Sequence, residues 1–320
     1  MNRKRVFTIG SIILGILLVV FLFCYGAWKK EKLLEKKERE EHAREEQGIS
    51  YGGETYEYNY NLRNVLFIGV DKSDELREHE AGWAGQADCL ILLSMDKDKQ
   101  ETTLLEISRD AMTDVETYGD NETYLGTQRM QIAAQYAYGD GQKRSCQLVT
   151  SAVSNLLYEI PIHSYVALSV DGIAKITELM GGVTITVPKD YTAIDPQFQE
   201  GTTLNLKGEQ AERYVRYRDK SVTGSNSERM ERQTQFLEAL ALQLQGKSVS
   251  WYQNLQAEAE EYIVTDLTLD EMDRLSRYPM NEEIQMVPGE VQQGEKYDEF
   301  IVDSEKLKEI VIKLFYKSEN

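Results

Sequence analysis

The chain has 320 residues, with 54 Asp and Glu against 36 Lys and Arg, and its formal net charge at pH 7 is −18. This acidic balance excludes a protein that binds nucleic acid through a basic face, because phosphate backbones attract Lys and Arg. Three cysteines and three histidines, scattered along the chain, leave no disulfide framework and disfavour a zinc site.

The N-terminal segment predicts a membrane anchor. Residues 6–28 contain no charged side chain and are rich in Ile, Leu, Val and Phe, and a helix of this length crosses a hydrocarbon layer of roughly 30 Å. At its exit, Trp28 and two lysines replace the small residues of a signal-peptide cleavage site. Basic residues flank both ends of the helix, so their count does not fix its orientation. We expect a tail at 1–5 followed by an uncleaved transmembrane helix at 6–28.

Residues 29–60 predict a charged stalk and linker. Up to residue 48, Lys, Arg and Glu mix at helical i,i+4 spacing with almost no apolar face, which is typical of a solvated helix. A stretch rich in Tyr and Gly, residues 51–61, then leads to the main domain.

The rest of the chain alternates strand and helix patterns. The run 64–71 is continuously apolar, as expected of a strand buried on both faces. Segments 88–95 and 101–108 flank a polar turn at 96–100, which predicts an antiparallel hairpin. Further strands are expected at 164–170, 183–187, 283–287 and 299–302, and helices at 142–158, 172–180, 208–217, 228–245, 269–277 and 304–316.

This mixture of elements predicts an α/β fold, an α-β-α sandwich with a central mixed sheet. Residues 61–245 are assigned to the main domain. Residues 246–320 form a C-terminal α/β extension that either completes this domain, which we favour, or stands as a small appendage.

Two carboxylates and an arginine are expected at the open end of the hairpin. If 96–100 is the turn, Asp88 lies opposite Ser108, beside Arg109 and Asp110. Carboxylate oxygens are the ligands that Mg²⁺ prefers, so a magnesium site is one interpretation. A polar strand exit with an ordinary salt bridge is the other, and from these residues alone it is favoured.

Arginines gather where the expected helix 208–217 ends and the helix 228–245 begins. Arginine forks bind phosphate oxygens in pairs, and a helix N-terminus adds a positive field. Ordinary pairing with glutamates on the same helices explains the cluster equally well, above all for Arg213, which points away from Arg216. The cluster consists of Arg213, Arg216, Arg218, Arg229, Arg232 and Gln233.

Other reaction classes find little support. The sequence has no G-x-x-x-x-G-K-[ST] phosphate loop, no G-x-S-x-G elbow and no H-E-x-x-H pair. Cys89 lies in an apolar strand and Cys146 at a helix start, so both are expected to be core or surface thiols. His79, in a polar loop, is a remote candidate for catalysis, and His163 is expected to be structural.

Seven sequence blocks from about Arg63 to Leu244 resemble the LytR-CpsA-Psr family. Members of that family are membrane-anchored bacterial enzymes that transfer glycopolymers, such as teichoic acids or capsule, from a polyprenyl-pyrophosphate carrier to peptidoglycan. The resemblance implies a single-pass protein of the cell membrane, with its N-terminus in the cytoplasm and its main domain outside. The blocks are, in order, NVLFIGVD, an Asp-headed strand, SRD, AAQYAYGDG, GGVTITVP, GEQAERYVRYR and ERMERQ.

The resemblance also implies the site. Mg²⁺ or Mn²⁺ would bind at Asp88 and Asp110, and these two residues with Arg109 would be catalytic. Phosphoryl transfer needs positioning and charge neutralisation rather than a covalent nucleophile. A carboxylate would take the proton of the attacking sugar hydroxyl. Asp88 or Asp110 is preferred for this role over Asp71. The implied pyrophosphate ligands are Arg109, Arg216, Arg218, Arg229, Arg232 and Gln233.

The sequence departs from the family pattern at two basic positions. Gln86 stands where the family has an arginine, and Gln131 where it has a lysine, with Arg129 nearby as a possible replacement. These changes leave an attenuated enzyme as one expectation. A non-catalytic envelope protein that binds polyprenyl-linked glycans and a polyprenyl-pyrophosphate hydrolase are the alternatives.

A polyprenyl chain also needs an apolar groove. Two helix faces offer one, although plain core packing is the favoured interpretation of both. They consist of Val149, Val153 and Leu156 on one helix and Phe236, Leu237 and Leu240 on the other.

Overall fold

A computed structural model describes residues 48–71, 84–119, 122–219, 221–222, 225–244, 247–281, 284–295 and 297–318. The expected tail, the membrane helix 6–28, the stalk up to residue 47 and His79 lie outside these ranges. Within them, no helix combines the length and the hydropathy needed to cross a bilayer. The chain divides into two units, Met1–Tyr58 with Lys317–Asn320, and Asn59–Tyr316.

The described part of the smaller unit contains a short hairpin. Its strands pair antiparallel around Gly52 and Gly53, whose φ angles of 62° and 86° lie in the left-handed region that glycine tolerates. The expected linker therefore holds regular structure over part of its length. The three-stranded sheet is ordered β1 (Ile49–Tyr51), β2 (Glu54–Tyr58) and β15 (Tyr316–Ser318).

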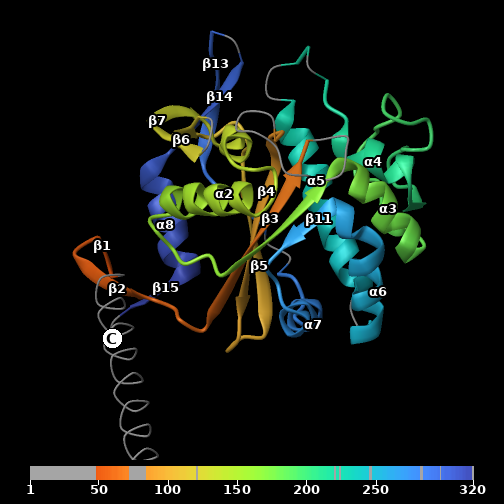
Figure 1. Ribbon diagram of the computed structural model, residues 1–320, viewed down its shortest axis with the longest axis horizontal. Coiled ribbons are helices and arrows are strands. Elements are labelled where there is room, and N and C mark those ends of the chain that lie inside the picture. The colour runs from red at the N-terminus through yellow and green to blue at the C-terminus, as the bar shows by residue number, and fades with distance from the viewer. Residues whose placement is uncertain are drawn as a thin grey trace, which may run out of the picture. The chain divides into compact units, whose positions relative to one another are not determined.

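The larger unit is built on a six-stranded mixed sheet (Figure 1). Strand β3 pairs with β8 in parallel and with β4 antiparallel, and all ten residues of β4 are buried, as suits a central strand. The expected mixed α/β fold and the strands at 64–71, 88–95, 101–108 and 164–170 are thus confirmed. The sheet order is β11 (Ile263–Thr265), β8 (Ser164–Ser169), β3 (Leu62–Val70), β4 (Ala87–Asp96), β5 (Glu101–Ile107) and β12 (Gln285–Met286).

In Figure 1 the sheet lies between two groups of helices. The first group contains α3, α4 and α6, and the second contains α2 and α8. The first group covers a cluster of apolar side chains that includes Ile91 and Leu93 of β4 and Leu237 of α5. Local signals fix helix ends: the Ser169 side chain caps α3, which stops at Gly181 with φ 81°. The helices are α2 (Lys143–Leu156), α3 (Val170–Met180), α4 (Glu209–Arg216), α5 (Asn226–Leu244), α6 (Val249–Ala259), α7 (Leu269–Arg277) and α8 (Ser304–Phe315).

Three hairpins stand apart from the central sheet. The strand expected at 183–187 belongs to one of them and not to the main sheet. In another, the Phe300 N–H donates to the Asp110 carbonyl at 2.9 Å, so this C-terminal hairpin is attached to the strand exit after β5. The pairs are β6 (Met112–Tyr118) with β7 (Tyr124–Gln131), β9 (Val183–Thr186) with β10 (Thr203–Leu206), and β13 (Gly289–Gln293) with β14 (Asp298–Val302); short 3₁₀ helices lie at Ile132–Tyr138 and Glu260–Tyr262.

Removal of the Phe198 ring tests the packing behind α4. Phe198 is fully buried and meets the ring of Tyr214 edge-on, with centroids 5.2 Å apart. Phe198→Ala should lower the free energy of unfolding by about 3–5 kcal/mol, because it leaves a cavity. Urea denaturation measures the loss, and Phe198→Leu, which fills more of the space, is the control. Equal stability of the alanine variant and the wild type would contradict this packing.

Candidate active site

The β4–β5 hairpin brings Asp88, Arg109 and Asp110 together. The turn is one residue shorter than expected, because Asp96 stays in β4 and pairs with Glu101. The Asp96 side chain accepts hydrogen bonds from the backbone N–H groups of Asp98 and Lys99 in the turn, at 2.9 and 3.2 Å. When the observed register is continued, Asp88 comes opposite Arg109, and the expected pairing of Asp88 with Ser108 is therefore wrong by one residue.

Asp88 lies between two arginines. The Arg109 guanidinium donates to one carboxylate oxygen, and Arg229 of α5 donates to the other at 2.9 Å. Asn226, three residues before Arg229, accepts from two nitrogens of that guanidinium at 3.2 and 2.6 Å. Asp88 is 8% exposed and Arg229 is 6% exposed, so this ionic group is buried and each charge needs its partners.

Asp110 lies beside this group. Its carboxylate is 3.5 Å from Nε of Arg109 and accepts a hydrogen bond of 2.9 Å from Gln131. The Gln131 amide also donates to the backbone carbonyl of Asp298 at 2.8 Å. Burial raises the pKa of Asp110, although nearby arginines oppose the shift. Burial lowers the pKa of Arg109 to about 10, which still leaves its guanidinium charged at neutral pH.

Two further arginines reach the same place from the end of α4. Arg216 is 2.9 Å from Glu212 on its own helix and 3.8 Å from Asp71 after β3. Arg218 is 3.4 Å from the carboxylate of Asp298. The expected pairing with a glutamate is therefore present for Arg216. The Arg216 side chain nevertheless lies in the same cleft as Arg109, Arg218 and Arg229.

The structure does not bring Arg232 into this cluster. Its guanidinium is 2% exposed, donates to the carbonyls of Tyr214 and Tyr217, and lies 5.0 Å from the ring centre of Tyr191. These contacts fasten the end of α4 to α5, so its expected place among the phosphate ligands is corrected to a structural one. Gln233 donates to the carbonyl of Val215 at 3.2 Å and lines an adjoining cavity.

Asp88, Asp110 and the arginines around them, without Arg232, line a cleft of about 640 Å³. Five arginines and five carboxylates cancel in formal charge, so an anionic ligand must compete with the carboxylates for the guanidinium groups. Arg213 belongs to this lining, although it also pairs with Asp195 at 3.0 Å. The lining consists of Asp71, Gln86, Asp88, Arg109, Asp110, Gln131, Glu212, Arg213, Arg216, Tyr217, Arg218, Arg229, Tyr297 and Asp298.

The two departures from the family pattern lie in this cleft. Gln86 accepts a hydrogen bond from Arg109, and Gln131 takes the contacts with Asp110 and Asp298 described above. Arg129 lies opposite Asp114 in the β6–β7 register and is not part of the cleft lining. It therefore does not replace the basic side chain that the resemblance implies at position 131. Amides therefore supply hydrogen bonds where the resemblance implies basic side chains.

The donor set at Asp88 and Asp110 suits a hard cation. Among the residues that the structure describes, no group of three or more His, Cys, Asp and Glu side chains is arranged to hold a metal. Mg²⁺, however, needs only one or two protein carboxylates and keeps several waters. Each carboxylate oxygen has two lone pairs, so the oxygens of Asp88 retain acceptor capacity beside their arginine partners.

The remaining candidates are structural. Cys89 and Cys146 are buried free thiols, and burial raises the pKa of Cys89 to about 12, which keeps it protonated. The ring of His163 accepts the Asn64 N–H at 3.0 Å, and burial lowers its pKa to about 4. Neither kind of side chain offers a nucleophile or base to the cleft.

Tyr297 and Asp298 are cleft residues that sequence reasoning missed. They belong to the C-terminal hairpin, far along the chain from every motif. Their segment is polar and has no periodicity, so the only local signal was an acidic residue after an aromatic one.

The observations define an α/β protein with a mixed sheet and an arginine-lined cleft. A solved structure of B. subtilis TagV has this fold, with a TM-score of 0.60, 23% identity, and coverage of 80% of this chain and 97% of that one. The family model of LytR_cpsA_psr matches residues 20–315, and the chain belongs to this family. The resemblance in the sequence blocks is thereby confirmed.

Two curated relatives are named polyisoprenyl-teichoic acid–peptidoglycan teichoic acid transferase TagU. The protein from Enterococcus faecalis is 27% identical over 85% of this chain and 82% of its own length. The protein from Halalkalibacterium halodurans is 29% identical over 65% of this chain, and the matched region spans 62% of that relative, less than two thirds.

A buried carboxyl lies next to the cleft. Glu106, on β5, is 4% exposed and accepts a hydrogen bond from Thr234 of α5. Burial, with the charges of Glu231 and Glu238, raises the pKa of Glu106 from 4.5 to about 7. Thr234 is five residues beyond Arg229 on the same helix, so this contact helps to set α5 against the sheet.

Glu106 should make the protein less stable as pH rises from about 4.5 to 7. In that range the folded chain retains a proton that the unfolded chain has released, and the penalty above pH 7 is roughly 3 kcal/mol. Glu106→Gln should therefore be the more stable protein at pH 8 and should lose this pH dependence, as measured by urea denaturation. Glu101→Gln, at the partly exposed start of the same strand, is the control and should change little. A Glu106→Gln curve parallel to the wild type would contradict the assignment.

Proposed function

We propose that the protein transfers a glycopolymer from a polyprenyl-pyrophosphate carrier to peptidoglycan, by Mg²⁺-assisted phosphoryl transfer at the outer face of the cell membrane. The observation that carries the proposal is an arginine-lined cleft that adjoins an apolar pocket. The names of the TagU relatives support the same classes of substrate. The anchor at residues 6–28 remains part of the proposal.

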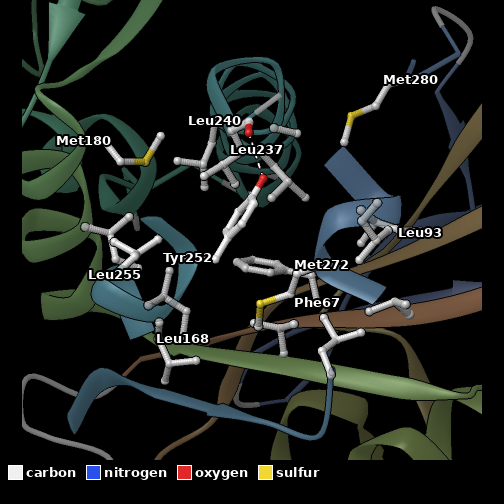
Figure 2. A pocket seen from close by; sticks show the side chains of 18 residues that line it. Phe67, Leu93, Leu168, Met180, Leu237, Leu240, Tyr252, Leu255, Met272 and Met280 are labelled. Atoms are coloured by element: carbon white, nitrogen blue, oxygen red, sulfur yellow. Dashed lines mark hydrogen bonds between the residues drawn. The ribbon is translucent and has the colours of Figure 1, made fainter. Parts of the chain in front are cut away.

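The apolar pocket lies between the sheet and helices α5, α6 and α7, and its volume is about 200 Å³ (Figure 2). A cavity of about 150 Å³ binds benzene, so this one has room for the first part of a polyprenyl chain. Tyr252 brings a hydroxyl group into the lining of the pocket. This hydroxyl donates a hydrogen bond to the Leu244 carbonyl at 2.7 Å. Leu237 and Leu240 of α5 line the pocket as the groove hypothesis requires, whereas the apolar face of α2 does not.

A smaller cavity of about 60 Å³ joins the pocket to the cleft. It shares Phe67, Leu168 and Leu237 with the pocket, and Arg216 and Arg229 with the cleft. An apolar chain in the pocket would therefore place its phosphates at the arginines. This order of spaces matches a ligand that carries a diphosphate on a long hydrocarbon.

The residues divide the reaction between them. Arg109, Arg216, Arg218 and Arg229 hold the pyrophosphate oxygens and stabilise the charge on the leaving lipid phosphate. A sugar hydroxyl of peptidoglycan forms a bond to the phosphorus that bears the glycan, and the bond from that phosphorus to the lipid phosphate oxygen breaks. The hydroxyl proton goes to a carboxylate of the cleft, Asp88 or Asp110. Mg²⁺ at Asp88 and Asp110 would supply further positive charge against the pyrophosphate.

Glycan transfer by the full chain in detergent tests this function. A polyprenyl-pyrophosphoryl sugar and peptidoglycan oligomers should yield a joined product, and chelation of Mg²⁺ should abolish it. Arg218→Ala should slow transfer by about 10²–10³-fold, since it removes a donor that stabilises transition-state charge. Arg277→Ala, an exposed arginine on α7, is the matched control.

Three results would overturn the proposal. Lipid binding that depends on Arg218 but gives no product would indicate the non-catalytic binding protein, which the neutral Gln86 and Gln131 favour. Release of phosphate without an acceptor would indicate a hydrolase. Transfer that Arg218→Ala leaves unchanged would place the reaction elsewhere.

A bulky residue in the apolar pocket tests the lipid path. Leu240→Trp should raise the KM for a long-chain carrier by about tenfold, because the indole fills space that the hydrocarbon needs. A carrier with a single isoprene unit should be unaffected. Leu242→Trp, at a position of α5 that is 60% exposed, is the control, and thermal denaturation checks both folds. Equal KM values for both variants with the long carrier would contradict the path.

A further inference from the structure

Two tyrosines with exposed rings line the polar cleft. Tyr217 follows α4 and is 41% exposed, and Tyr297 precedes β14 and is 48% exposed. Neither lines the apolar pocket or the connecting cavity. The transfer chemistry leaves both rings without a role.

Hydrogen bonds and ion pairs hold residues at or next to both tyrosines. Beside Tyr297, Asp298 is held through its carboxylate by Arg218 and through its carbonyl by Gln131, at 3.4 and 2.8 Å. The Tyr217 N–H donates to the Arg213 carbonyl at 3.2 Å, which ends α4 at this residue. A ligand that packs on these rings would therefore cost little ordering of the chain.

Both tyrosines line the cleft, but neither lines the connecting cavity. The connecting cavity meets the cleft at Asp71, Asp88, Arg216 and Arg229, which do not include either tyrosine. In phosphoryl transfer the attacking and leaving oxygens are roughly in line, on opposite sides of the phosphorus. If the lipid phosphate leaves toward the connecting cavity, the attacking hydroxyl approaches from the part of the cleft that faces away from that cavity.

We propose that Tyr217 and Tyr297 form a subsite for a sugar ring of the acceptor glycan, an inference that rests on the proposed transferase. One face of a pyranose ring presents C–H groups, which pack on an aromatic ring, and tyrosine offers a rigid surface for this contact. Glu212 and Asp298 in the same lining accept hydrogen bonds from the sugar hydroxyls.

Steady-state kinetics of the full chain separates acceptor from donor. Tyr217→Ala and Tyr297→Ala should each raise the KM for soluble peptidoglycan fragments by about tenfold and leave the KM for the lipid-linked donor within twofold. The Phe variants keep the ring and should behave like the wild type. Tyr124→Ala removes a tyrosine that is 56% exposed on β7 outside the cleft, and it is the matched control. A rise in the donor KM instead, or no rise at all, would overturn the subsite.

A binding measurement distinguishes failure of the subsite from failure of the transferase. Saturation-transfer NMR with peptidoglycan fragments alone should show sugar-ring signals with the wild type and lose them with the Tyr217→Ala, Tyr297→Ala double variant. If the wild type gives these signals but no transfer, the subsite stands and the transferase does not. If transfer occurs and the double variant retains the signals, the transferase stands and the subsite falls.

Discussion

The ionic group around Asp88 is the constraint on which the site depends. Its carboxylate lies at the start of β4, and its two arginines come from the exit of β5 and from α5. A buried carboxylate with two guanidinium partners is costly to break, because loss of any one leaves an unpaired charge away from water. The group thus links the hairpin to the helix that also lines the apolar pocket. The position of α5 then sets Arg229 and one wall of the apolar pocket together.

Residues of the C-terminal part contribute to the lining of the cleft. Asp298 pairs with Arg218, and its carbonyl shares the Gln131 amide with Asp110. Residues 59–316 form one compact unit, as this exchange of contacts requires. The cleft therefore depends on segments that are more than 200 residues apart, from Asp71 to Asp298, and its shape is a property of the whole unit.

Much of this arrangement could be predicted from sequence, and the limits have physical causes. Continuous apolar runs identify β3, β4 and β5, and the polar turn between the last two brings Asp88 to Arg109 within one residue of the true register. Residue type alone cannot tell which arginines of a cluster face a cleft, and Arg232 turns to backbone carbonyls because of how α5 packs on α4. Tyr297 was unpredictable because long-range hydrogen bonds place its hairpin, and no local pattern encodes them.

The cancellation of charge in the cleft has a consequence for selectivity. Five arginines matched by five carboxylates project little field beyond a Debye length of about 8 Å. A chain with a net charge of −18 would in any case repel anions at a distance. Free inorganic phosphate is therefore not drawn in by long-range attraction, and it brings no hydrocarbon to compensate for displacing a carboxylate. For the proposed lipid-linked diphosphate, the attached hydrocarbon would supply binding free energy that a small anion lacks.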